Sequence, residues 1–427
     1  MRILVLGSGA REHALAWKLS TEPVVTSVVC APGNPGIARR IPTAALDPLD
    51  TDAVIRFVDD HHIDLVVVGP EAPLERGIVD RFLAENRKIF GPSRAAAQLE
   101  TSKAFAKDFM HRHGVPTARF RTCTSADEAL AAIRAGEFGD AMVVKADGLA
   151  AGKGVVVAQD RAAAEAAVTA AMVDKSFGAA GARVVLEELL AGPEVSFFVV
   201  ANGESYVPLL SAQDHKRIFD NDEGPNTGGM GAFAPSPLMN AALQQQIETT
   251  IVQPVLKGMA AEGNPFRGFL YCGLMLTATG PKVIEFNVRF GDPEAQAVLP
   301  LLPHLAALLS DTPSATPGTA ALPSVPSAAL VSVAVVLAAH GYPGDVRTGD
   351  VIRGLDDVAR DCPDVQVFFA GVKEKDGHLV TAGGRVLTVM ATAPSYDIAM
   401  ARAYEAASKV SFEGMQYRRD IGRKAVR

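Results

Sequence analysis

The 427-residue sequence predicts a multidomain fold that combines an α/β parallel-sheet domain with α+β units. Residues 1 to about 100 alternate short β-rich runs with helical stretches, which is typical of a parallel sheet covered by helices. The chain is longer than one typical domain. Residues 311–328 are rich in Pro, Ala, Ser and Thr and read as a linker. The predicted units are an N-terminal α/β domain (1–101), a middle region (102–312) with a lobe at about 115–192, a linker (313–328) and a C-terminal α+β domain (329–427).

Composition excludes several classes of protein. Hydrophobic residues make up 48% of the chain and charged residues 21%, as in a globular protein with ample core material. The net charge of −7 argues against nonspecific binding to nucleic acid or to an anionic membrane. No apolar run is long enough for a signal peptide or a membrane span, so we expect a cytoplasmic protein. The widely spaced cysteines form no C-x-x-C pair and fit reduced thiols: Cys30, Cys123, Cys272 and Cys362.

The first strand, residues 3–6, runs into a glycine turn, Gly7-Ser8-Gly9, that opens a helix. The amides of such a turn can hold a phosphate. Glu12 stands where a G-x-G-x-x-G motif has its third glycine, and the second strand (24–30) ends without a carboxylate for a ribose, so a dinucleotide site is disfavoured. Arg11 fits a smaller phosphorylated ligand better.

Two more strands, 65–68 and 88–90, should end at the same edge of the sheet, where open α/β folds bind ligands. The turns that follow them begin Gly69-Pro70-Glu71 and Gly91-Pro92. Glu71 is a candidate site residue, although a proline-rich turn explains the same pattern.

Residues 142–145 and 155–158 read as two strands joined by a glycine-rich turn. The glycines allow backbone amides to approach an anion, and the lysines add positive charge. The candidates in this hairpin are Lys145, Gly148, Gly152, Lys153 and Gly154. The pattern favours nucleotide phosphates over an ordinary hairpin with solvated lysines. It is not a Walker A loop, because a strand rather than a helix follows.

Helices at about 102–111 and 162–173 flank this hairpin, and Lys103 lies on the first. A strand at 183–188 then leads through a turn to Glu194 and a strand at 195–200. Such a strand end can seat an adenine, with Glu194 on the ribose, although a lone Glu after Gly-Pro is usually a turn residue.

Residues 213–230 form a long polar stretch that we expect to be a loop rather than a core element. Long loops of this kind are often functional. Asp214, His215, Lys216 and Arg217 place opposite charges side by side, as a loop contacting a zwitterion or a phosphate would. A solvated surface loop explains the composition equally well.

A strand pair at 269–277 and 282–287 carries Glu285 and Asn287 on one face, with Phe286 on the other. A carboxylate and an amide oxygen at this spacing suit Mg²⁺. Arg289 continues that face and could stabilise a transferring phosphoryl group. A solvent-facing strand also alternates in this way. Beyond the linker, strands near 331–338, 365–370 and 386–391 and a helix at about 396–410 predict the C-terminal α+β unit.

With these motifs in view, the chain resembles the ATP-grasp ligases and, more closely, the phosphoribosylamine–glycine ligase family. The motifs that carry the resemblance span nearly the whole chain: GSGAREHALAWK, VGPEAPL, KADGLAAGKGV, QDHKR, GPNTGGMGA, EFNVRFGDPEAQ, HGYPGDVRTGDVI and GGRVL. The resemblance implies a preATP-grasp domain, a bilobal ATP-grasp region and a C-terminal unit that closes the site. It implies ATP-dependent joining of glycine to 5-phosphoribosylamine through a glycyl phosphate, with Mg²⁺ or Mn²⁺. A cytoplasmic monomer without nucleic-acid or membrane partners is expected.

The same resemblance implies roles for individual residues. ATP contacts fall on Lys103, Lys145, Asp147, Gly148, Gly152, Lys153, Gly154, Glu187, Leu190 and Glu194. In that set Lys103 and Lys145 contact the phosphates, and residues 147–154 form a lid over them. Glu187 and Leu190 frame the adenine, and Glu194 contacts the ribose. Glu285 and Asn287 are the implied metal ligands. The catalytic set is Lys145, Arg289 and Asp292. The substrate contacts are Gly9, Arg11, Glu71, Asp214, Lys216, Arg289 and Asp292.

Three departures from the family pattern stand out. Ala10 replaces a glycine, the strand 271–277 carries no carboxylate for a second metal contact, and the segment after Leu309 is short and rich in proline. Rival interpretations are another carboxylate ligase of the same fold, a non-catalytic nucleotide-binding relative and an NAD-binding protein. The loop 224–232 and the lack of a biotin-carrier sequence disfavour the first. The presence of Lys145, Glu285 and Asn287 disfavours the second.

Overall fold

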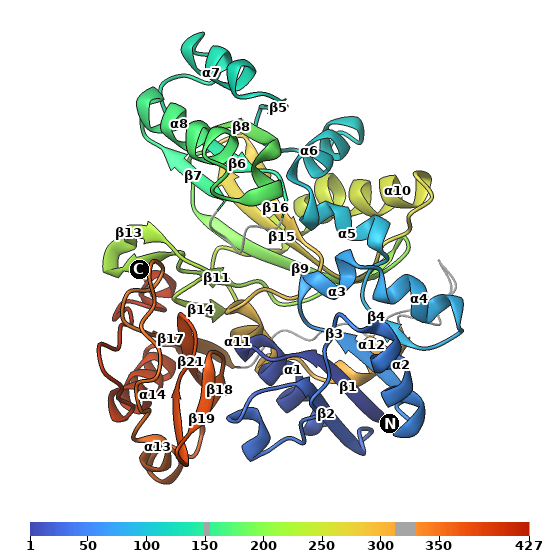
Figure 1. The fold of residues 1–427 in the computed structure, drawn as a ribbon, viewed down its shortest axis with the longest axis vertical. Coiled ribbons are helices and arrows are strands. Elements are labelled where there is room, and N and C mark those ends of the chain that lie inside the picture. The colour runs from blue at the N-terminus through green and yellow to red at the C-terminus, as the bar shows by residue number, and fades with distance from the viewer. Residues whose placement is uncertain (149–153, 312–329, 427) are drawn as a thin grey trace.

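The computed structural model describes residues 1–148, 154–311 and 330–426. Its N-terminal domain is a parallel sheet covered by helices, as the alternating pattern predicts (Figure 1). The strands, in spatial order, are β2 (Ser27–Pro32), β1 (Arg2–Gly7), β3 (Leu65–Val68) and β4 (Ile89–Phe90). The helices are α1 (Ala10–Ser20), α2 (Thr51–Asp60), α3 (Glu71–Glu75), α4 (Ile78–Ala84) and α5 (Arg94–Thr101). The second strand begins later than residue 24, because Val24 is exposed and its carbonyl accepts a hydrogen bond from the N-terminal amine rather than from a strand.

The small lobe contains the predicted glycine-rich hairpin within a four-stranded antiparallel sheet. The strands, in spatial order, are β5 (Phe120–Cys123), β8 (Val184–Glu188), β6 (Met142–Ala146) and β7 (Val155–Ala158). The helices α6 (Lys103–Arg112), α7 (Ala126–Arg134) and α8 (Arg161–Val168) accompany it. The helix predicted over 162–173 stays α-helical only to Val168 and continues as a π-helical turn. Thr169 bonds its hydroxyl to the Glu165 carbonyl at 2.9 Å, and this competes with regular helix geometry.

The large lobe is built on a second antiparallel sheet, which faces apolar neighbours on both sides. Its strands, in spatial order, are β10 (Ser205–Pro208), β9 (Glu194–Asn202), β15 (Arg267–Thr277) and β16 (Gly280–Asn287). The helices α9 (Ala241–Ile247) and α10 (Gln253–Ala261) cover one face. Along β9, Phe197 and Val199 join the core beneath these helices, whereas Phe198 and Val200 join the core toward the N-terminal domain. This double burial explains the nearly continuous apolar run in β9.

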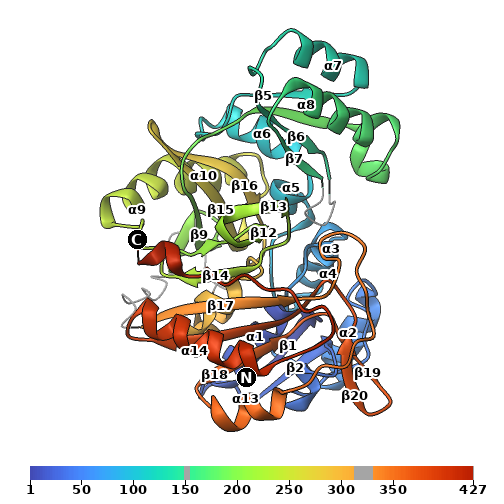
Figure 2. The same ribbon diagram turned by 90° about the vertical axis from the view of Figure 1, so that its left-hand side faces the viewer.

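The C-terminal unit shares its sheet with the middle of the chain, as Figures 1 and 2 show. The five strands, in spatial order, are β11 (Gln213–Asp214), β14 (Gly231–Ala234), β17 (Val331–Ala338), β21 (Arg385–Ala393) and β18 (Val365–Phe369). The remaining elements are α13 (Leu355–Asp361), the hairpin β19 (Val372–Lys375) with β20 (His378–Thr381), and α14 (Tyr396–Lys409). The helix α11 (Glu294–Val298) is buried against α1, β14 and β17, so three parts of the chain meet around it.

The stretch 213–230 is more ordered than the loop that its polar composition predicts. Its ends belong to the shared sheet, and its centre forms a hairpin of β12 (Arg217–Phe219) and β13 (Glu223–Asn226). His215 and Met230 are fully buried. The expectation of a loop rather than a core element was therefore wrong for these residues. The stretch is held by the pairing of β11 with β14 and by a hydrogen bond from the Val336 amide of β17 to the Met230 carbonyl at 3.0 Å. In the described part of the chain, no helix is long and apolar enough to cross a membrane.

His13 joins the N-terminal domain to the C-terminal unit. Its Nδ1 accepts a hydrogen bond from the Phe369 amide at 3.0 Å, and its ring stacks on the Phe369 ring. Burial lowers the pKa of His13 to about 3, and Arg40 adds to the shift. The imidazole is therefore neutral where it acts as an acceptor.

This contact predicts acid sensitivity. Above the ordinary histidine pKa of 6.5, His13 is neutral in both states and adds no pH dependence. As the pH falls below 6.5, the unfolded chain takes up a proton that the folded chain refuses until about pH 3, so stability is lost by about 1.4 kcal/mol per pH unit. His13→Gln keeps an acceptor that does not titrate in this window. Urea unfolding from pH 4.5 to 7 should show a shallower slope for this variant. The exposed His378→Gln should keep the wild-type slope, and equal slopes for all three proteins would contradict the expectation.

Candidate active site

A buried ion-pair triad lies within the small lobe, on α6, β6 and β8. The Glu187 carboxylate, on β8, lies between two lysines: its Oε1 is 2.8 Å from Lys145 Nζ, and its Oε2 is 2.8 Å from Lys107 Nζ. All three side chains are buried. Burial lowers the pKa of Lys107 to about 8, although Glu187 opposes the shift. The carboxylate of Glu187, a residue predicted to frame an adenine, contacts Lys145 and Lys107 in this structure.

Lys145 also reaches across to β16, where the strand is irregular. The pairing of β15 with β16 shifts register between Gly273 and Leu274, which leaves Ile284 as the extra residue of a bulge. The Ile284 carbonyl accepts a hydrogen bond from Lys145 Nζ at 2.8 Å. Bulges re-aim individual groups of a strand. Here the bulge fixes the lysine against the strand that carries Glu285.

The start of α6 anchors the first residues of the glycine-rich turn. Asp147 Oδ1 accepts hydrogen bonds from the Ala104 amide and the Ser102 hydroxyl, both at 3.1 Å. Lys103 Nζ donates to the Gly148 carbonyl at 2.9 Å. Gly154 pairs with Ala146 at the other end of the turn. The predicted phosphate contacts Gly152 and Lys153 lie outside the described residues.

Lys216 brings the predicted ribose, metal and loop residues together. Its ammonium lies 2.8 Å from Glu194 Oε2 and 3.9 Å from Glu285 Oε1. Burial raises the pKa of Asp214 to about 7, and Glu294, Glu194 and Glu285 add to the shift while Lys216 opposes it. Leu190 lies, partly buried, in the segment between β8 and β9. The term lysine cluster is used below for four lysines and three carboxylates: Lys103, Lys107, Lys145, Lys216, Glu187, Glu194 and Glu285.

Glu285 and Asn287 share one face of β16, whereas Phe286 is buried on the other, as the alternation predicts. Burial acts to raise the pKa of Glu285, but Lys216, Lys145, Lys103 and Arg289 outweigh it and hold the pKa below its usual range. Among the described residues, neither side chain has a hydrogen-bond partner, so both oxygens are available to a cation. No group of three or more His, Cys, Asp or Glu residues suited to a metal occurs in the described part of the chain. A divalent cation held on this face would take one carboxylate and one amide oxygen from β16 and further oxygens from a ligand.

The glycines near the first strand of the N-terminal domain leave space for the side chain of Glu12. A Cβ on Gly7, Gly9 or Gly69 would collide with Glu12, which is buried among them. Glu12 Oε2 accepts a hydrogen bond from the Gly9 amide at 2.8 Å, and its Oε1 pairs with Arg11 Nε at 2.6 Å. The glycines thus accommodate Glu12, which is why the G-x-G pattern occurs without a dinucleotide site. The Gly9 amide, predicted to face a substrate, is committed to Glu12.

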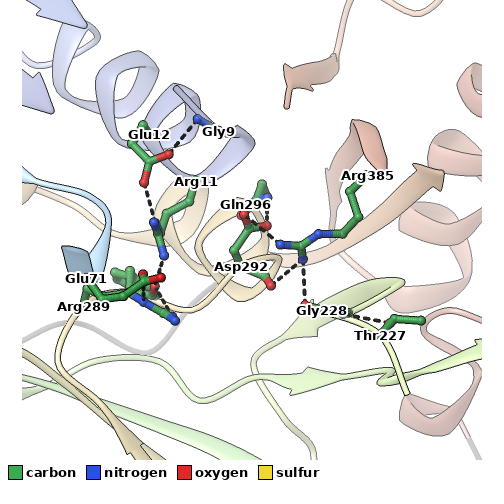
Figure 3. A network of polar contacts seen from close by, with 12 residues as sticks. Gly9, Arg11, Glu12, Glu71, Thr227, Gly228, Arg289, Asp292, Gln296 and Arg385 are labelled. Carbon is green, nitrogen blue, oxygen red and sulfur yellow. Dashed lines mark hydrogen bonds and ion pairs between the residues drawn. The ribbon is translucent and has the colours of Figure 1, made fainter. Parts of the chain in front are cut away.

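Figure 3 shows Arg11, Arg289 and Arg385 converging from three parts of the chain. The Arg289 guanidinium pairs with Glu100 at 2.8 Å and with Glu71 at 3.4 Å, and it donates to the Phe290 carbonyl at 3.1 Å. Burial acts to raise the pKa of Glu71, but Arg289 and Arg11 outweigh it and lower the pKa. The predicted residues Glu71 and Arg289 therefore lie together.

Asp292 is held from both sides in the same view. Its Oδ1 accepts a hydrogen bond from the Gln296 amide at 2.8 Å, and its Oδ2 lies 3.2 Å from Arg385. Arg385 also donates to the carbonyls of Gly228 and Asp292, each at 2.7 Å. Burial acts to raise the pKa of Asp292, but Arg385 and Arg11 outweigh it and lower the pKa. Arg11, Arg289 and Arg385, with Glu71, Glu100 and Asp292, are termed the arginine cluster below.

Reasoning from sequence missed three residues of these clusters, Glu100, Lys107 and Arg385, and the nearby buried residue Glu294. Glu294 is buried at the start of α11 and accepts a hydrogen bond from Ser196 at 3.1 Å. Arg385 belongs to the GGRVL motif, which marked the family resemblance without indicating how far its side chain reaches. Lys107 lies one helical turn after Lys103, so helix spacing alone could have placed both on one face.

Comparisons with known proteins cover the whole chain. The N, ATP-grasp (A) and C domain models of phosphoribosylglycinamide synthetase match residues 1–100, 101–295 and 332–424. A phosphoribosylamine–glycine ligase of Pasteurella multocida is 47% identical over 429 residues, covering 100% of this chain and 98% of that protein. One of Brucella melitensis is 48% identical over 427 residues, with the same two coverages, 100% and 98%.

Solved structures agree. Phosphoribosylamine–glycine ligase from Thermotoga maritima superposes with a TM-score of 0.85 at 35% identity, covering 98% of this chain and 100% of that one. The biotin carboxylase domain of the Hydrogenobacter thermophilus 2-oxoglutarate carboxylase superposes with a TM-score of 0.71 at 16% identity, covering 97% and 91%. The second likeness concerns the fold alone. Together they confirm the predicted multidomain fold class.

Proposed function

The chain belongs to the phosphoribosylglycinamide synthetase family, and we propose that its two clusters divide the reaction of that family between nucleotide and acceptor. It is a carbon–nitrogen ligase that uses ATP to join glycine to 5-phosphoribosylamine in purine biosynthesis, giving glycinamide ribonucleotide. The lysine cluster takes the ATP phosphates, and the arginine cluster takes glycine and phosphoribosylamine. The observation that carries this division is the run of β16 and its continuation, because Glu285 and Asn287 face the lysines while Arg289 and Asp292 join the arginines.

We propose that the reaction passes through glycyl phosphate. An oxygen of the glycine carboxylate attacks the γ-phosphorus and ADP leaves; the phosphoribosylamine nitrogen then attacks the glycyl carbon, and phosphate departs with that oxygen. Lys145, fixed by Glu187 and Ile284, offsets charge on the phosphates. Arg289 belongs to the arginine cluster and follows β16, the strand that carries Glu285, so it can hold the transferring group in line with the acceptor.

Glu285 and Asn287 are the proposed ligands of Mg²⁺ or Mn²⁺, supported by their shared face on β16 and by the carboxylate and amide oxygens that they place there. A cation held by these two residues would supply positive charge to offset that of the ATP phosphates. Arg11 and Glu71 are proposed to face the phosphoribosylamine, and Asp214 and Lys216 to adjoin the nucleotide and glycine. We also propose a cytoplasmic monomer, in line with the family resemblance and four free, buried cysteines in the described chain. Light scattering at assay concentration tests the monomer.

An oxygen-transfer experiment tests the proposed route. ADP release is first measured with each substrate omitted in turn, and it should require glycine and phosphoribosylamine together. The reaction is then run with glycine labelled with ¹⁸O in its carboxylate. One labelled oxygen should appear in the phosphate released per turnover. Ligation with unlabelled phosphate would refute glycyl phosphate while leaving the ligase activity intact.

Arg385→Met, a change in the C-terminal unit, should lower activity because it disturbs the arginine cluster. The change removes two donors to the backbone of the Gly228 and Asp292 segments and the partner of the Asp292 carboxylate. We expect kcat/KM for glycine to fall by about 100-fold, as displaced positioning groups typically cause. Steady-state kinetics with each substrate varied separately measures this. Arg402→Met is the matched control, because Arg402 donates to Thr392 within the same unit. Equal kinetics for the two variants would contradict the role of Arg385.

A further inference from the structure

The C-terminal segment lies against the β12–β13 hairpin, far from it in sequence (Figure 1). The centre of this contact is Arg418, which is only 1% exposed. Its guanidinium donates to the Arg217 carbonyl at 3.1 Å and to Asp222 Oδ1 at 2.9 Å. Two further donations, at 2.8 and 2.7 Å, reach the Asp420 carboxylate. One planar group therefore ties the end of the chain to both sides of the hairpin turn.

The neighbours of Arg418 strengthen the same contact. Asp420 Oδ2 accepts from the Asn221 amide at 2.9 Å, and Asp220 Oδ1 accepts from the Arg419 amide at 2.7 Å. Lys424 pairs with Asp222 at 2.7 Å. The turn needs such support, because the φ angles of Asn221 and Asp222 are 59° and 58°, in the left-handed region that non-glycine residues rarely adopt. Residues 418–424 are termed the tail clamp below.

The tail clamp bonds the residue that follows Lys216, a proposed substrate contact. Arg418 bonds the carbonyl of Arg217, and the preceding residue, Lys216, points its ammonium at Glu194. The Lys216 carbonyl accepts from the Thr227 amide at 2.7 Å and from the Thr227 hydroxyl at 2.9 Å. The backbone of Lys216 is thus fixed by the hairpin on one side, and the hairpin is fixed by the clamp.

Stability alone is a weak explanation for this arrangement. Ile218 is the only residue of the hairpin in a described hydrophobic cluster, so the hairpin adds little to a core. A buried ion pair costs desolvation that its attraction often only balances, whereas it can specify one conformation. The geometry favours a clamp that sets where one loop lies.

We propose that Arg418 is a positioning residue that, through the tail clamp, holds Lys216 in the lysine cluster. This inference rests on the proposed role of Lys216 at the nucleotide and glycine. Arg418 touches no reacting group and acts only through the hairpin. Loosening the clamp lets the hairpin and Lys216 shift, while the neighbouring strands β9 and β15 keep their packing.

The test compares Arg418→Met and Arg418→Lys with a matched control in the full-length enzyme. Arg419→Met is the control, because the exposed Arg419 uses only its backbone amide in the clamp. Arg418→Met should lower kcat/KM for ATP and glycine by about 10- to 100-fold. Arg418→Lys should recover part of this loss, and Arg419→Met should behave as wild type. In Arg418→Met, hydrogen exchange should be faster than in wild type in peptides spanning 215–227 and unchanged in β9 and β15.

Asp222→Asn provides a second route if Arg418→Met does not fold, because Asp222 is half-exposed and asparagine tolerates its backbone angles. It should reproduce the exchange increase and a smaller kinetic loss. If Arg418→Met or Asp222→Asn combined wild-type kinetics with faster hydrogen exchange in 215–227, the inference would be overturned. Lost activity with unchanged exchange there would also overturn it. Lys216→Met separates the two proposals: wild-type kinetics for it would reject the role of Lys216, whereas impairment of it but not of Arg418→Met would reject the clamp.

Discussion

Glu285→Gln is expected to lower kcat by about 100- to 1,000-fold, the range seen when a charge-stabilising group of an active site is removed. Four cations surround Glu285 and hold its pKa below the usual range, so its carboxylate is ionised at neutral pH. Glutamine keeps the shape and removes the charge. A cation held by one carboxylate and one amide would lose its single charged ligand from the chain.

ATP affinity gives a readout that does not depend on turnover. Without divalent cation, Glu285→Gln should bind ATP at least as tightly as wild type, because a negative charge near the phosphates is gone. With Mg²⁺, the gain in affinity that wild type shows should be largely absent. Calorimetric titration in both conditions measures the difference. Glu188→Gln is the matched control, since Glu188 lies on β8 and pairs with Lys282 of β16, the strand that carries Glu285. A magnesium-dependent gain equal to that of wild type in Glu285→Gln would reject the proposed ligand.

Local patterns were enough to predict the elements that carry the site. Alternation of short β-rich runs with helical stretches predicted the parallel sheet of the N-terminal domain, and two β-rich runs around a glycine-rich turn predicted the hairpin of β6 and β7. The two-residue period placed Glu285 and Asn287 on one face. These signals depend only on neighbours in the chain, and packing reinforces them.

Contacts between distant segments could not be predicted in this way. The room for Glu12 depends on Gly69, which follows a different strand, and Asp292 meets Arg385 only because α11 brings the C-terminal sheet beside it. The bulge at Ile284 leaves no signal in a run of alternating residues. In the stretch 213–230, polar composition favoured a loop, whereas pairing with β14 and β17 determined the outcome. In each case tertiary packing, not local preference, set the structure.

Arg289→Met is expected to abolish measurable ligation and to lower the free energy of unfolding by about 3–5 kcal/mol, the usual cost of leaving a buried charge without its partner. The planar guanidinium of Arg289 forms ion pairs with Glu100 and Glu71 and donates a hydrogen bond to the Phe290 carbonyl. A lysine has no such fork, so Arg289→Lys should recover little activity.

The buried Glu100 allows the structural and catalytic roles of Arg289 to be separated. Burial raises the pKa of Glu100, Glu71 adds to the shift, and Arg289 opposes it, so loss of Arg289 must raise that pKa further. At pH values below the ordinary 4.5 the carboxyl is protonated in both the folded and unfolded states. The instability of Arg289→Met should therefore be least there and grow as the pH rises toward the shifted pKa. Adding Glu100→Gln removes the unpaired charge and should restore most of the stability, with a flatter pH dependence measured by urea unfolding. Ligation should stay absent in this double variant, because the guanidinium beside the proposed phosphoryl path is still missing. Recovery of turnover together with stability would mean that Arg289 matters only for the fold.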